Sequence, residues 1–301
     1  MLQFPTLELA PGTKEQLVYR KQQTTPDQLA VLIIKPSNNI LNANSTDQNV
    51  ESIIGRFEEK EWSLQALKLL EGNESNIERL IAHYPQPFFD GRIEDVASQL
   101  TPAEKEKLIE VWGKEATAYP IYHPLQIAGK GIADYATLAK IWHTGRGNDN
   151  KLIDIGHVEG INTISPEKDS NYGKRRLLLV KNNPALPNVQ PFFMVNGFSA
   201  ELAVKFSRSG EKMIIMAFGK EGSYTLEHMR RYAVGATSPY EAEPGSIRYD
   251  ALHNDTYAGD HPITSADVVG IENNIVHLSE NDTDSRHELQ LWLPEIAWHS
   301  N

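Results

Sequence analysis

The chain has 301 residues, of which 40% are hydrophobic and 23% charged, a composition typical of a folded globular protein and unlike that of a disordered one. Its formal net charge of −11 excludes general binding to nucleic-acid backbones, because such binding needs clustered cations. The sequence contains no cysteine, which excludes disulfides, thiolate metal sites and cysteine nucleophiles.

Targeting signals are also missing from the sequence. No apolar run approaches the roughly eighteen residues that a membrane helix needs. The first residues, Met-Leu-Gln-Phe-Pro, lack the basic region and apolar stretch of a secretory signal. We therefore expect a cytoplasmic protein with no membrane partner.

The N-terminal part begins with a polar, proline-containing arm at residues 1–28, with a short strand expected at 16–20. Residues 30–34 are continuously apolar and β-branched, which predicts a strand buried on both faces. Lys35 follows at the carboxyl end of that strand, where sites in such folds tend to lie.

Further elements follow in the first 85 residues. Apolar residues at helical spacing, among them Ile53, Ile54 and Phe57, predict a helix. A second strand is expected at 63–70 and a second helix at 74–83, which ends before Pro85 because the residue before a proline avoids the helical region.

Residues 85–195 have a different character. Thr101-Pro102-Ala103-Glu104 predicts a helix start, in which the threonine caps and the glutamate bonds back. A second helix is expected at 132–142, a polar loop at 148–173 and a short strand at 176–180.

The C-terminal part returns to alternating elements. We expect a helix at 200–206, a strand at 213–218 and a helix at 225–233. Ile275 and Val276 indicate the end of a buried strand, and His277 lies where that strand stops. A neutral imidazole is nucleophilic near pH 7, so a histidine on a rigid strand end suits phosphoryl transfer, provided that a partner orients the ring.

Several blocks of the sequence resemble the nucleoside diphosphate kinase family. The segment around His277 is similar to the active-site signature Asn-x-x-His-x-Ser followed by Glu-x-x-Leu-Trp, and it is carried by Asn274, His277, Ser279, Glu288, Leu291 and Trp292. Four further blocks occur in the family's order: residues 29–36, ending in Ile-Lys-Pro; 53–58 with 64–68; Arg231 with Thr237-Ser238-Pro239; and 244–248, Pro-Gly-Ser-Ile-Arg. Leu278 and Glu280 depart from the glycine and aspartate that are common there.

The resemblance implies an α+β fold, a ferredoxin-like βαββαβ sandwich whose antiparallel sheet carries helices on one face. It divides the chain into an arm at 1–28, a core in two parts at 29–84 and 196–301, and a mainly helical insertion at 85–195.

The resemblance also implies roles for individual residues. His277 would accept the γ-phosphoryl group of a triphosphate and pass it to a diphosphate, with Glu288 and Ser279 orienting the ring. Lys35 would act as a mobile point charge near the transferred group, and Tyr84 would pack beside the histidine and lysine.

The remaining implied roles concern the nucleotide. Arg231 and Arg248 would clamp terminal phosphates, since a guanidinium fork matches two oxygens. Thr237 would donate to a phosphate and Asn274 would bond the ribose. The base would stack on a phenylalanine; Phe88, Phe192 and Phe198 are candidates, and the distance from Ser209-Gly210 favours Phe198.

The partners implied are nucleoside di- and triphosphates, with Mg²⁺ held mainly by the nucleotide phosphates, in a homo-oligomer. Two alternatives stay open. The chain could be a nucleotide-binding or regulatory module that has lost turnover, which the insertion, the long loop at 249–273 and Leu278 motivate. It could also be a phosphohistidine enzyme with a non-nucleotide acceptor reached through the insertion.

Overall fold

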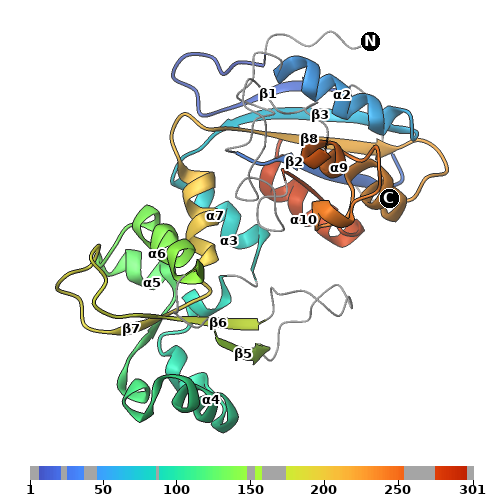
Figure 1. Cartoon of the computed structure of the whole chain (residues 1–301). Helices are drawn as coiled ribbons and strands as arrows, with labels where there is room; N and C mark the ends of the chain where they lie inside the picture. Colours follow the sequence, from blue (N-terminus) through green and yellow to red (C-terminus); the bar gives the residue numbers. More distant parts are fainter. Residues whose placement is uncertain are drawn as a thin grey trace. The chain divides into compact units, whose positions relative to one another are not determined.

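The computed structural model describes residues 7–21, 26–36, 46–85, 88–147, 153–157, 174–253 and 275–296 (Figure 1). The chain divides into two compact units. The first comprises Met1–Arg79 with Lys205–Asn301, and the second comprises Leu80–Val204.

The first unit contains a five-stranded sheet in the order β1-β3-β8-β2-β9, in which every pairing is antiparallel. Its strands are β1 (Glu15–Arg20), β2 (Leu29–Ile34), β3 (Trp62–Glu71), β8 (Lys212–Lys220) and β9 (Val276–Leu278). All of β2 is buried, in agreement with its continuous apolar sequence. The strand that we expected in the N-terminal arm is present as β1, at the edge of the sheet.

The register of the sheet determines which face His277 occupies. His277 pairs with Ile33 of β2, and Ile33 pairs with Ile215 of β8. Side chains alternate between the two faces of a strand, so His277 lies on the face opposite its neighbours Val276 and Leu278. The latter two belong to the main apolar core of this unit.

Helices cover both faces of this sheet, whereas the sequence analysis expected them on one. The main core packs α2 (Thr46–Glu58), the helical segment 226–234 and α9 (Ile247–His253) against one face. The other face carries α10 (Asp282–Trp292), whose Glu288 bonds His277. Apolar residues on both faces of β2 require this second cover, because a strand buried on both sides cannot face solvent.

The helix expected at 225–233 is present but is not a regular α-helix. It begins as α8 (Leu226–His228), capped by Thr225, and continues as a π-helix at Met229–Val234. Its last backbone bond runs from the Gly235 N–H to the Arg230 carbonyl, five residues back. Such a widened turn is rare and often occurs at functional sites.

The second unit combines helices with a four-stranded sheet. Its helices are α4 (Pro102–Trp112), α5 (Pro124–Gly129), α6 (Tyr135–Gly147) and 3₁₀ turns at Phe89–Arg92, Val96–Gln99 and Lys114–Ala118. The sheet has the order β4-β7-β6-β5, formed by Ile121–Tyr122, Phe192–Val195, Lys174–Val180 and Ile153–His157. Two helices, α3 (Ser75–His83) and α7 (Phe198–Ser207), cross the boundary between the units.

Of two helix starts predicted in the second unit, one is confirmed and the other lies three residues later than expected. The capping box at Thr101 and Glu104 is present, with both reciprocal hydrogen bonds. The helix expected at 132–142 starts later, at Tyr135, because the Asp134 carboxylate accepts the Thr137 N–H and caps the chain there.

The sheet of this unit was predicted only in part. The strand expected at 176–180 is present as part of β6, but its partner β5 lies inside the stretch that we expected to be a polar loop. The short strands β4 and β7 also escaped prediction, because two to four residues give too little alternation to detect. The second unit therefore combines a four-stranded sheet with helices and is not mainly helical, as the sequence had led us to expect.

None of the helices described by the structure is long and apolar enough to cross a membrane.

Candidate functional site

His277 and Glu288 form the centre of the candidate site. His277 is the middle residue of β9, and its side chain is 16% exposed. Its Nε2 atom lies 2.7 Å from Oε1 of Glu288, a buried carboxylate on α10. The structure thus joins two residues that are eleven positions apart in the sequence.

Ser279 fixes the position of that carboxylate. The Ser279 hydroxyl donates to Glu288 Oε2 at 2.6 Å and accepts the Val31 N–H at 2.8 Å. The Ser279 N–H in turn donates to the Val31 carbonyl at 3.0 Å. Because β2 holds the serine and the serine holds the carboxylate, the partly exposed imidazole is oriented by two buried side chains.

The hydrogen bonds determine the tautomer of His277. An ionised carboxylate only accepts, so Nε2 must carry the proton that it donates to Glu288. In the neutral ring, Nδ1 then keeps its lone pair. The pKa of His277 lies well below its usual value, first because burial disfavours the charged ring and then because Lys35, Arg248 and Arg230 are positive. The ring is therefore neutral near pH 7 and able to act as a nucleophile.

Arg248, on α9, is buried and is held by two backbone carbonyls. Its Nη1 donates to the Gly235 carbonyl at 2.9 Å and its Nη2 to the Val276 carbonyl at 2.8 Å. The second contact places the guanidinium against the strand that carries His277. The Arg248 position is thereby fixed by the backbone on both sides.

Gly235 makes this arrangement possible. Its φ of 96° and ψ of 164° lie in a region that residues with a side chain avoid. A Cβ at this position would lie 2.5 Å from the Ser246 hydroxyl, so only glycine lets the two segments approach this closely.

Lys35 lies directly after β2, and its N–H donates to the Ile275 carbonyl at 3.0 Å, beside the start of β9. Its pKa is well below the usual value, first because of burial and then because Arg248 and Lys205 are positive. Lys35, Arg248 and Lys205 therefore form a group of neighbouring cations, and two of them act on His277. Such a group attracts a polyanion.

Arg231 and Thr237 lie in a different environment from that expected. The Arg231 side chain is 64% exposed and pairs with Glu243, at 2.8 Å from Nη2. Thr237 is exposed in the bend before the 3₁₀ turn Pro239–Glu241. The structure does not bring Arg231 to His277 in the way that it brings Lys35.

Three further predicted residues have no determined relation to His277. Asn274 lies outside the residues that the structure describes. Tyr84 and Phe198 belong to the second unit. There, Tyr84 packs edge-on against His83 with ring centroids 4.1 Å apart, and Phe198 starts α7 within an apolar cluster.

Sequence analysis missed two cations of the site, Arg230 and Lys205, whose charges lower the pKa values of His277 and Lys35 respectively. Helical spacing could have found Arg230, because it stands four residues after Leu226 and four before Val234, both buried. Lys205 lies in the last turn of α7 and has no comparable signal.

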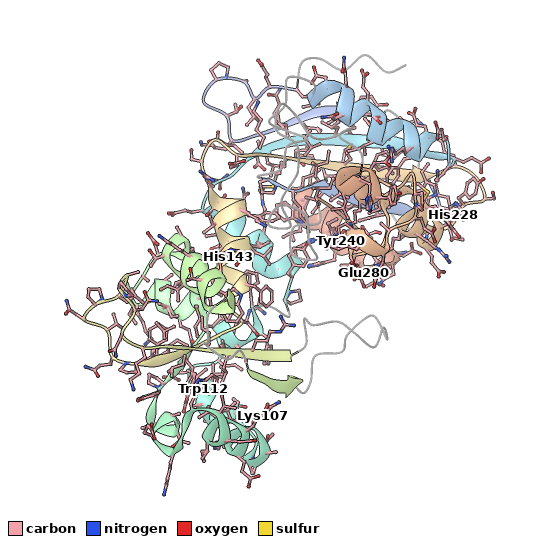
Figure 2. The ribbon with its side chains drawn as sticks, viewed as in Figure 1. Lys107, Trp112, His143, His228, Tyr240 and Glu280 are labelled. Carbon is pink, nitrogen blue, oxygen red and sulfur yellow. The ribbon has the colours of Figure 1, made fainter. Side chains whose placement is uncertain are left out.

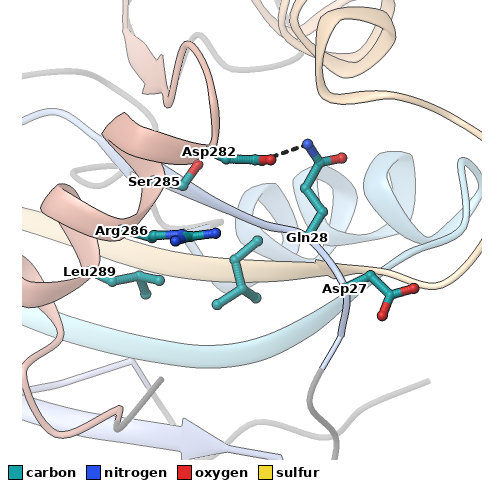
Figure 3. Close-up of a pocket in the computed structure, with 7 residues that line it drawn as sticks. Asp27, Gln28, Asp282, Ser285, Arg286 and Leu289 are labelled. Carbon is teal, nitrogen blue, oxygen red and sulfur yellow. Dashed lines mark hydrogen bonds between the residues drawn. The ribbon is translucent and has the colours of Figure 1, made fainter. Parts of the chain in front are cut away.

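A small hollow lies beside another face of α10 (Figure 3). Asp282, Ser285, Arg286 and Leu289 line it from the helix, and Gln28 closes one side by donating to Asp282 at 2.6 Å. None of the site residues named above lines this hollow, so we do not assign it to the candidate site.

Comparison with known proteins finds several relatives at low sequence identity, and they share one name. No family model matches the chain. A nucleoside diphosphate kinase of Pyrobaculum aerophilum is 32% identical over 92 residues, which are 31% of this chain and 45% of that protein. One of Prochlorococcus marinus is 28% identical over 147 residues, 47% of this chain and 72% of that protein. The chain thus spans under half of the first of these relatives.

Solved structures similar to this one include a kinase of the same name from Pyrobaculum aerophilum, with 18% identity, coverage of 89% of this chain and 96% of that chain, and a TM-score of 0.38. The sequence relatives carry the conclusion: over part of its length, the chain is similar in sequence to nucleoside diphosphate kinases.

Proposed function

We propose that this protein is a nucleoside diphosphate kinase that works through a phosphohistidine at His277. The observation that carries the proposal is the buried His277–Glu288–Ser279 chain, set beside the positive charges of Lys35 and Arg248. A neutral, oriented imidazole next to fixed cations is what transfer of an anionic phosphoryl group requires.

The proposed reaction has two matching steps. The Nδ1 lone pair of His277 attacks the γ-phosphorus of a nucleoside triphosphate, a P–N bond forms, and the bond to the β,γ-bridging oxygen breaks. The diphosphate leaves with that electron pair. A terminal oxygen of a second diphosphate then attacks the phosphorus, and the P–N electron pair returns to Nδ1.

Glu288 stabilises the charge that develops on the ring. The Nε2 proton stays on the imidazole throughout, so the ring becomes positive when Nδ1 is phosphorylated. The carboxylate 2.7 Å away offsets that charge. Ser279 keeps the carboxylate in place during both steps.

The cations would act on the phosphates. Lys35 and Arg248 neutralise charge on the transferred group and its neighbours in this proposal. The roles of Thr237 at phosphate, Asn274 at ribose, Tyr84 beside the histidine and Phe198 under the base follow from the family relationship and stay proposals. The same relationship suggests Arg231 at phosphate, but its pairing with Glu243 on the exposed side of the helix argues against that role.

Mg²⁺ is part of the proposal as an ion that arrives on the nucleotide. The side chains described around His277 are mainly cations, and Glu288 is already engaged by His277 and Ser279. This donor set fits an ion held by phosphate oxygens and offers no carboxylate cage, so we assign no protein ligand to it. Bound to the phosphates, the ion would neutralise part of their charge.

We also propose a ferredoxin-like core for the first unit. Without β1, its strand order is β3-β8-β2-β9. Along the chain, helix α2 follows β2 and helix α8 follows β8. This order is that expected for a βαββαβ arrangement. The sequence-based bounds, with 29–84 and 196–301 as core and 85–195 as the insertion, stay a proposal; the compact units of the structure divide instead after Arg79 and before Lys205. A homo-oligomer is proposed with it, and light scattering of the purified protein tests it.

The decisive experiment uses γ-labelled ATP. The wild type should acquire acid-labile label and pass it to a second diphosphate, His277→Ala should acquire none, and His228→Ala, a change at a partly exposed histidine, should behave as the wild type. If the wild type acquires no label but still binds nucleotide in calorimetry, the result would support the nucleotide-binding alternative instead. If the label is passed only to a non-nucleotide acceptor, the result would support a phosphohistidine enzyme with another acceptor.

A further inference from the structure

Two adjacent arginines on the π-helix differ in their surroundings. Arg231 donates to Glu243 from both Nε and Nη2, at 3.1 and 2.8 Å, and lies over the Tyr232 ring. Its pKa is raised first by the hydrogen bond to Glu243, and the negative charges of Glu243 and Glu227 act in the same direction. Arg231 is thus already neutralised on the outer surface.

Arg230 is less exposed than Arg231 and has a different acidic partner. Helical spacing places it beside the buried face formed by Leu226, Met229 and Val234, and the π-helix packs against β9. Its side chain is 36% exposed, and its Nη2 lies 3.5 Å from Glu280, three residues after His277.

The surroundings of Arg230 extend to the start of α10. Its positive charge opposes the rise in the pKa of Asp284, a rise caused first by burial and then by Glu288 and Glu280. The same charge helps to lower the pKa of His277. Arg230 therefore lies close to the end of β9 and the beginning of α10, where the imidazole is found.

We propose that Arg230, released from Glu280 when nucleotide binds, is the π-helix arginine that contacts the terminal phosphates, in place of Arg231. This inference rests on the proposed phosphoryl transfer at His277. Glu280, labelled in Figure 2, is exposed, and its contact with Arg230 is long. Such a surface ion pair is weak, so its exchange for a charge-assisted bond to a phosphate oxygen is favourable.

The π-helical turn accounts for the phosphate contact being assigned to Arg230 and not to Arg231. The segment is α-helical only up to His228, both arginines lie in the π-helix, and the bond from the Gly235 N–H to the Arg230 carbonyl spans five residues. One extra residue in a turn rotates the residues around it relative to a regular helix. Arg230, and not the arginine that the sequence motif identifies, then has its acidic partner directly after β9.

The first test needs no activity. The charged groups that face His277 are Lys35 after β2, Arg248 on α9, Arg230 on the π-helix and Glu288 on α10. Arg230→Gln should raise the pKa of His277, measured by NMR titration of the ring, because one of three positive neighbours is lost. Arg231→Gln, the matched neighbour, should leave it as in the wild type. An unchanged pKa in Arg230→Gln, or an equal rise in both variants, would overturn the assignment.

The second test measures transfer. We expect kcat/KM for ATP to fall about 10- to 100-fold in Arg230→Gln, as for loss of one bond between a charged donor and phosphate, and less than about threefold in Arg231→Gln. The acid limb of the rate–pH profile should also move to higher pH in Arg230→Gln only. Glu280→Gln, which frees Arg230, should lower KM.

The reverse ranking, with Arg231→Gln the more damaged variant, would overturn the assignment while the kinase proposal stands. A wild type without phosphohistidine would remove the kinase proposal, and with it the phosphate role of Arg230, whatever the NMR titration shows about its proximity.

Discussion

Replacement of Glu288 by glutamine separates the charge of this residue from its shape. Glu288 accepts from His277 at 2.7 Å and from Ser279 at 2.6 Å while buried. An amide oxygen can still accept the Nε2 proton, but it cannot stabilise the positive ring of the phosphorylated state as a carboxylate does. A hydrogen bond to a charged group contributes about 1.5–3 kcal/mol, so phosphorylation of His277 should slow about 10- to 100-fold.

Stability should change much less. The glutamine nitrogen can donate to the Ser279 hydroxyl, which can turn toward the Val31 carbonyl, 3.3 Å away. We therefore expect the free energy of unfolding to fall by about 1 kcal/mol or less.

Rapid quench with γ-labelled ATP gives the rate, and urea denaturation gives the stability. Glu243→Gln, which removes a surface carboxylate paired with Arg231, serves as the control and should be unaffected in both. A Glu288→Gln variant that is labelled at the wild-type rate would refute the electrostatic role. A variant that loses several kcal/mol of stability would show that its slow labelling has a structural cause.

Two further predictions concern stability. Gly235→Ala should lower the free energy of unfolding, measured by urea denaturation, by about 1–3 kcal/mol or more, because of backbone strain and a steric clash. Gly245→Ala is the control: this glycine also has a positive φ but lies in open space, so its replacement should cost less. Equal losses of stability would contradict the close approach at Gly235. Lys68 is buried and paired with Glu15 at 3.0 Å and Glu295 at 2.7 Å. Lys68→Met should change the free energy of unfolding by only about 1 kcal/mol, because both carboxylates are partly exposed and can hydrate. The double variant Glu15→Gln, Glu295→Gln should cost about 3 kcal/mol, because it leaves the buried ammonium without a counter-charge. The opposite ranking of the two variants would refute this.

Sequence patterns predicted the parts of this fold that depend on short stretches of chain. The apolar run at 30–34 is long enough to indicate burial on both faces, and the capping box at Thr101 depends on four consecutive residues. The motif around His277 also gave the pairing with Glu288, because the family relationship supplies a contact that helical and strand periodicity cannot.

The errors occurred where a contact between distant segments, or a single residue, decides the geometry. Strand β4 pairs with β7 over only two residues, and β7 itself has only four residues, all paired with the distant β6. Helical spacing puts Arg230 nearer than Arg231 to the buried positions of the segment at 226–234, but it cannot show which acidic residue each arginine pairs with. The neighbours of the two arginines, Glu280 and Glu243, are what separate them.

The cations around His277 serve two requirements that would otherwise conflict. A carboxylate next to an imidazole favours the protonated ring, which has no lone pair for attack. Glu288 could therefore disable the nucleophile that it orients. Burial opposes protonation, and the charges of Lys35, Arg248 and Arg230 oppose it further. In the proposed mechanism the same charges would attract the phosphate, so the groups that bind the substrate would also keep Nδ1 unprotonated until it attacks.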